Sequence, residues 1–95
     1  MSKNRLLYSE CLKIYKVSDS FIESLHESGL IHLERSEQDL FIEYDELTDL
    51  EQFVRWHCDM DINVPGIEAL YHMLNRVRTL QLELEELRNE LRFYR

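Results

Sequence analysis

The first third of the chain carries apolar residues at helical spacing. Residues 9–15 (SECLKIY) predict a short helix with Ser9 as its N-cap. Asp19 or Ser20 then caps a second helix, and Gly29 supplies its C-terminal stop. The apolar residues of this second helix recur three and four positions apart, which turns the following side chains inward: Phe21, Ile22 and Leu25. Two short helices joined by a tight turn form a helix-turn-helix pattern.

The next segment alternates between apolar and polar residues, which is typical of strands. Residues 36–39 (SEQD) predict the turn of a β-hairpin, or wing, whose apolar residues share one face: Ile31, Leu33, Leu40, Ile42 and Tyr44. Asp45 then caps a third helix, which the break at residues 63–66 (NVPG) ends because proline favours the first turn of a new helix. The side chains expected to face inward from this third helix are Leu47, Leu50, Val54, His57 and Cys58.

From about Pro65 no further helix breaker interrupts the chain, so the pattern predicts one long C-terminal helix. Its apolar residues occupy the a and d positions of four heptads and form a seam: Leu70, Met73, Val77, Leu80, Leu84, Leu87, Leu91 and Tyr94. Such a seam is typical of a coiled coil, and a second copy of the chain is the simplest partner. The alternative is a long helix that folds back on its own domain.

The flanks of this seam also carry information. Ile67 and Leu74 lie at e positions, so the first turns offer a second apolar flank that can cover the globular core. Glu83 and Glu90 at g are opposite in sign to Arg88 and Arg95 at e, which suits pairing between parallel copies. The seam alone leaves the direction of the pair open.

Length and composition fit one small domain with an appended helix, because a hydrophobic core is normally built from about 100 residues or more. We expect a helix-turn-helix domain over residues 1–64 and the C-terminal helix over residues 65–95 of the 95-residue chain. With two glycines and one proline, the chain belongs to the mainly α class. No apolar stretch is long enough to span a membrane, and two cysteines are too few for a disulfide framework. These features favour a cytoplasmic protein whose cysteines are reduced and buried.

The net charge of −8 is concentrated in the middle of the chain. Residues 31–61 carry ten acidic side chains against two basic ones. A surface of this kind repels nucleic acid and anionic membranes, and it attracts a basic protein surface. The first 16 residues are the exception, since their bases outnumber their acids: Lys3, Arg5, Lys13 and Lys16 against Glu10.

Residues suited to catalysis or to cofactor and metal binding are sparse. The densest cluster, residues 57–61 (HCDMD), places neighbours about 100° apart around a helix, which hinders a shared metal ion. No glycine-rich phosphate loop or G-x-S-x-G motif is present. We therefore predict a protein that is not an enzyme and that needs neither a cofactor nor a metal ion.

A winged helix-turn-helix normally suggests DNA binding, but the charges disagree with that function. The second helix is expected to point Glu23 and Glu27 outward, together with Ser24 and His26, where a DNA-reading helix needs arginine or lysine. The wing offers Arg35 alone among Glu34, Glu37 and Asp39. The charges therefore argue against DNA binding, and a protein-binding module fits both the fold and the charges.

The order of helix-turn-helix, wing, third helix and leucine-rich terminal helix resembles the chaperone-modulator family (CbpM-like), itself similar to the DNA-binding half of MerR-type regulators. The most specific part of the likeness is residues 64–67 (VPGI) followed by Leu70, Leu74 and the leucines through Leu87, although an aromatic residue is expected where Val64 stands. The resemblance implies a MerR-like fold and a modulator that binds the J-domain of a DnaJ-type co-chaperone and inhibits it. A MerR-like transcriptional regulator is the alternative.

The candidate partner-binding surface lies on the third helix and at its start. One stripe of that helix combines acidic and aromatic side chains and is expected to face outward: Asp49, Gln52, Trp56 and Asp59. A tryptophan among acids can anchor a basic helix, although a Trp56 packed beneath the last helix or the wing fits the periodicity slightly better. The wing-to-helix junction extends the acidic surface through Glu43, Asp45 and Glu46.

Overall fold

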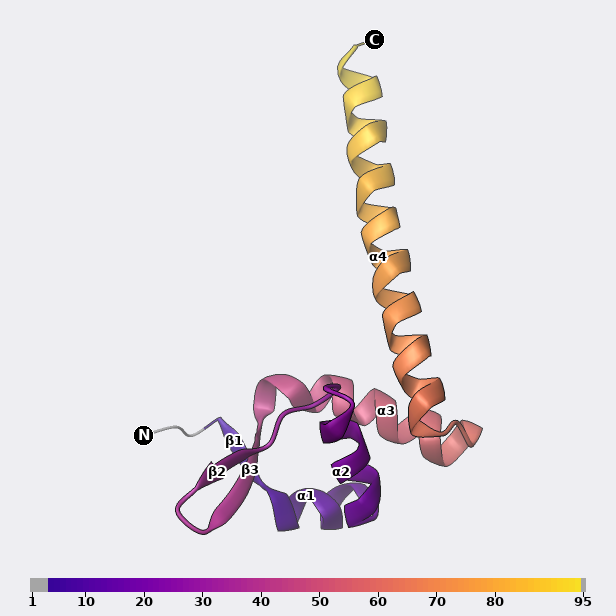
Figure 1. The fold of residues 1–95 in the computed structure, drawn as a ribbon. Helices are drawn as coiled ribbons and strands as arrows, with labels where there is room; N and C mark the ends of the chain where they lie inside the picture. The colour runs from indigo at the N-terminus through magenta and orange to yellow at the C-terminus, as the bar shows by residue number, and fades with distance from the viewer. Residues whose placement is uncertain (1–3, 95) are drawn as a thin grey trace.

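A computed structural model describes residues 4–94 and contains a globular head from which one long helix projects (Figure 1). The elements follow one another as β1 (Arg5–Leu7), α1 (Tyr8–Tyr15), α2 (Asp19–Glu27), β2 (Glu34–Ser36), β3 (Asp39–Glu43), a 3-10 turn (Tyr44–Glu46), α3 (Leu47–Met60) and α4 (Val64–Phe93). This arrangement is mainly helical with a small sheet, and it is that of a winged helix-turn-helix.

The helix-turn-helix is made by α1 and α2. Lys16 adopts a left-handed conformation (φ 56°) and ends α1, and the Ser18 hydroxyl accepts a hydrogen bond from the Phe21 N–H at 3.2 Å to begin α2. Gly29 (φ 80°) ends α2 as predicted. The predicted caps were wrong by one or two residues, since Leu7 precedes α1 in place of Ser9, and Ser18 caps α2 in place of Asp19 or Ser20.

The wing belongs to a three-stranded antiparallel sheet in which β3 lies between β1 and β2. The predicted hairpin is confirmed, but it turns over two residues, with Glu37 at a positive φ of 58°, and Ile31 and Leu33 lie before its first strand. Strand β1 was not predicted. Its Arg5 guanidinium lies 4.3 Å from the centre of the Phe41 ring and 3.6 Å from the Glu34 carboxylate, and these contacts join β1 to the wing.

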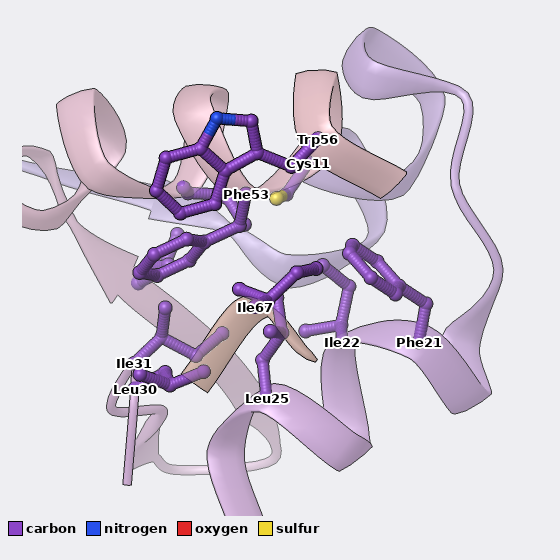
Figure 2. Close-up of a cluster of buried hydrophobic side chains, with 11 residues drawn as sticks. Cys11, Phe21, Ile22, Leu25, Leu30, Ile31, Phe53, Trp56 and Ile67 are labelled. Atoms are coloured by element: carbon purple, nitrogen blue, oxygen red, sulfur yellow. The ribbon is translucent and has the colours of Figure 1, made fainter. Parts of the chain in front are cut away.

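The core of the head lies between α2, α3 and the base of α4. Figure 2 shows Ile67 of α4 among side chains of α2 and α3. Within residues 4–94, eleven apolar residues are buried: Cys11, Phe21, Ile22, Leu25, Leu30, Ile31, Ile42, Leu50, Phe53, Trp56 and Ile67. From α3, Leu47, Leu50 and Val54 face the core as predicted, and Phe53 joins them. Cys58 was predicted to be buried and is exposed.

The break between α3 and α4 forms as the sequence predicts, with Val64 as the first helical residue. Asp61 takes a left-handed conformation (φ 58°) that ends α3, and the Asn63 side chain accepts a hydrogen bond from the Gly66 N–H at 2.9 Å. A side chain at Gly66 would place its Cβ 2.8 Å from the side chain of Ile62, which lies in the connection between α3 and α4, so glycine leaves room for this tight connection. Ile67 is fully buried and Leu74 partly, so the predicted second flank of α4 does cover the core.

Candidate functional site

The wing-to-helix junction gathers carboxylates, but part of its charge is used within the head. Glu46 accepts a hydrogen bond from the His32 backbone N–H at 2.9 Å and lies 3.3 Å from His32 Nδ1. Glu43 hydrogen-bonds to the Glu34 carboxyl group, and this bond and the repulsion between the two charges raise the pKa of Glu43. Asp45 is exposed. The junction therefore gathers several carboxylates, of which Asp45 is the one exposed to solvent.

The predicted outward stripe of α3 is largely covered, because the base of α4 packs beside it. The Tyr71 hydroxyl of α4 donates a hydrogen bond to the Asp49 carboxylate at 2.9 Å, and this bond, followed by burial, raises the pKa of Tyr71. Trp56 is only 7% exposed and lies beside Phe53, with their ring centres 6.1 Å apart. The prediction of an exposed tryptophan anchor was wrong, since Trp56 belongs to the hydrophobic core.

The predicted acidic surface is therefore not one continuous patch. Gln52 is half-buried between the covered positions, and Asp59 is exposed near the C-terminal end of α3. Asp45 precedes the helix, so about 14 residues separate the two exposed carboxylates, or about 20 Å at 1.5 Å per residue. A single partner helix has to span most of α3 to contact both.

The outer face of α2 carries the charges that the sequence predicts. Glu23, His26 and Glu27 are exposed, and His26 Nδ1 lies 3.3 Å from the Ile31 carbonyl oxygen. Among the bases near the N-terminus, Arg5 is occupied by Glu34 and Phe41, whereas Lys13 and Lys16 are exposed. Lys3 lies outside the described residues.

A groove that the sequence did not predict runs between α2 and the wing. It has a volume of about 410 Å³ and is lined by Glu23, His26, Glu27, Leu33, Arg35 and Leu40. Leu33 and Leu40 are half-buried, so they offer part of their apolar surface to the groove. The alternation of the hairpin did place Leu33 and Leu40 on one face, but it gave no sign that α2 stands opposite them.

The predicted seam of α4 is exposed beyond its first turns. Leu70 is half-buried because it also packs against the core, whereas the other seam residues are between 46% and 88% exposed: Met73, Val77, Leu80, Leu84, Leu87, Leu91 and Tyr94. Figure 1 shows that this part of α4 projects away from the head. Arg95, the last predicted e residue, lies outside the described part of the chain.

Groups suited to chemistry are few among residues 4–94. Burial raises the pKa of the Cys11 thiol, which disfavours the reactive thiolate. His57 stacks on Phe21 at 4.3 Å, and its Nδ1 lies 3.0 Å from the Ile62 carbonyl oxygen. No cluster of three potential metal ligands occurs within these residues, and none of their helices is long and apolar enough to cross a membrane.

A scan of family models finds a match to the MerR HTH family regulatory protein model over residues 6–89, which includes both the head and most of α4. The chain belongs to the MerR helix-turn-helix family. CbpM-like proteins belong to the same family, which agrees with the resemblance of the sequence to chaperone modulators. No match was found among curated proteins or among solved structures.

Proposed function

We propose that this MerR-family protein is a non-enzymatic modulator that binds the J-domain of a DnaJ-type co-chaperone and inhibits it in the cytoplasm. The observation that carries the proposal is the outer face of α2. Glu23 and Glu27 lie there, at the place where a DNA-reading helix presents arginine or lysine side chains. A protein partner with a basic helix complements these negative charges, whereas the phosphates of DNA are repelled by them.

The proposed active form is a homodimer joined through α4. Seven seam residues with 46–88% exposure are more apolar surface than a stable soluble monomer normally leaves in water. In a parallel pair, Glu83 faces Arg88 of the second copy, which adds charge complementarity at the edge of the seam. Each dimer then presents two heads to its partners.

A MerR-like transcriptional regulator is the second candidate, and the family membership favours it directly. The exposed Lys13 and Lys16 of the α1 region are available to contact phosphates. This function requires α2 to approach DNA despite its carboxylates. It therefore predicts weak DNA binding whose affinity falls steeply as the salt concentration rises.

Two measurements on the purified 95-residue chain decide between these functions. Isothermal titration calorimetry against a purified J-domain is expected to give a saturable complex whose affinity falls as salt rises. Selection from random DNA duplexes at physiological salt is expected to recover no preferred site. A palindromic site bound at nanomolar affinity, with no J-domain complex, would replace the proposal with the regulator function.

A further inference from the structure

The groove between α2 and the wing has two walls of different charge and an apolar floor. Glu23 and Glu27 form the α2 wall with His26 between them, Arg35 stands on the wing side, and the half-buried Leu33 and Leu40 line the space between. The groove is therefore not a simple acidic patch. It combines apolar surface, which drives association, with fixed charges, which select and orient an occupant.

The spacing of the carboxylates indicates what kind of segment fits. Glu23 and Glu27 are one helical turn apart, so their carboxylates match two bases at i and i+4 on another helix. The edge strand β2 next to the groove has only three residues, which is too short to bind an extended peptide by strand addition.

We propose that this groove receives an amphipathic basic helix of the partner protein. The bases of the helix face Glu23 and Glu27, its apolar residues contact Leu33 and Leu40, and a carboxylate on its far flank pairs with Arg35. The inference rests on the proposed function in taking a protein as partner, and it moves the contact from the covered stripe of α3 to the space between α2 and the wing.

The test uses the whole 95-residue chain with two probes, a purified J-domain and an 18-residue helical peptide with two lysines at i and i+4 beside an apolar stripe. The groove variant is Glu23→Lys with Glu27→Lys. Its control is Glu85→Lys with Glu86→Lys, which makes the same change of charge at exposed α4 positions away from the seam. Circular dichroism checks that both variants keep the fold.

For both probes we expect the groove variant to bind about tenfold more weakly than the wild type, because two attractive pairs become repulsive, and the control to stay within about twofold. A second peptide, with glutamates in place of the two lysines, is expected to bind the groove variant better than the wild type. The control variant carries the same change in net charge, so a reversal that occurs with the groove variant and not with the control reports charges that face each other directly.

The outcomes separate the groove from the function. If the J-domain binds the wild type and both variants with the same affinity, the groove is not its binding site, and the proposed function still stands. A J-domain that fails to bind the wild type removes the proposed function, and the peptide reversal then still tests the groove. Duplex DNA that displaces the peptide at physiological salt overturns the assignment of a protein occupant.

Discussion

Replacing Trp56 by alanine distinguishes a core residue from a partner anchor. Trp56 is 7% exposed, packs beside Phe53, and belongs to the same buried cluster as Ile67 of α4. The substitution removes a large side chain from this cluster and leaves a cavity that the surrounding residues close only in part. We therefore expect Trp56→Ala to act on the stability of the fold first.

The expected loss is about 3–5 kcal/mol, the usual range for a buried tryptophan changed to alanine. Native stabilities run at about 0.05–0.15 kcal/mol per residue, so a chain of this length has roughly 5–14 kcal/mol in total. Each kcal/mol corresponds to about 4–8 °C in a small domain, and the melting temperature is expected to fall by at least about 12 °C.

Far-UV circular dichroism in urea and on heating measures this loss, with Phe93→Ala as the control. Phe93 is 89% exposed, so its removal is expected to change stability by less than about 0.5 kcal/mol. Trp56 is the only tryptophan of the chain, so the fluorescence of the wild type should shift to longer wavelength as the core opens. A Trp56→Ala protein with wild-type stability and weakened partner binding would refute the core assignment.

Two further predictions concern the seam and the pH dependence of stability. Burying about half of a leucine side chain contributes roughly 1 kcal/mol, and Leu84→Lys with Leu87→Lys removes this contribution at four places in a dimer. The double substitution should therefore weaken dimerisation at least about a thousandfold, as measured by light scattering. A variant that remains dimeric contradicts the role of the seam. Burial and a hydrogen bond to Glu51 raise the pKa of Tyr15 to about 12, so the protonated phenol stabilises the fold below pH 10, and this contribution is lost as the pH rises towards 12. Tyr15→Phe should therefore reduce the fall in unfolding free energy between pH 9 and 11.5, and an unchanged slope would argue against a folded-state bond.

Local signals in the sequence predicted the elements that depend on local physics. Gly29 ends α2 because its backbone adopts a positive φ, and the residues around Pro65 separate α3 from α4 through an N-cap at Asn63. The helical spacing of Phe21, Ile22 and Leu25 placed all three in the core. These features need no knowledge of the rest of the fold.

The errors occurred where a distant segment decides the outcome. Strand β1 has only three residues and forms because β3 offers a free edge, which the sequence of β1 does not reveal. The α3 stripe through Asp49 and Trp56 was predicted to face solvent, but Tyr71 of α4 hydrogen-bonds to Asp49, and Trp56 packs in the core. A mixed polar and aromatic stripe does not reveal which element packs against it, so the sequence could not decide whether Trp56 faces a partner or the core.

The first turns of α4 connect the head to the seam. Leu70 and Leu74 pack against the core, and the same helix continues without a break to Phe93, so head and seam share one element. In the proposed dimer the two α2–wing grooves are consequently held at a fixed separation. A partner that offers two basic helices at a matching distance gains affinity from both grooves, whereas an isolated helix gains from only one. The spacing of the heads is then a determinant of partner choice, separate from the charge of either groove.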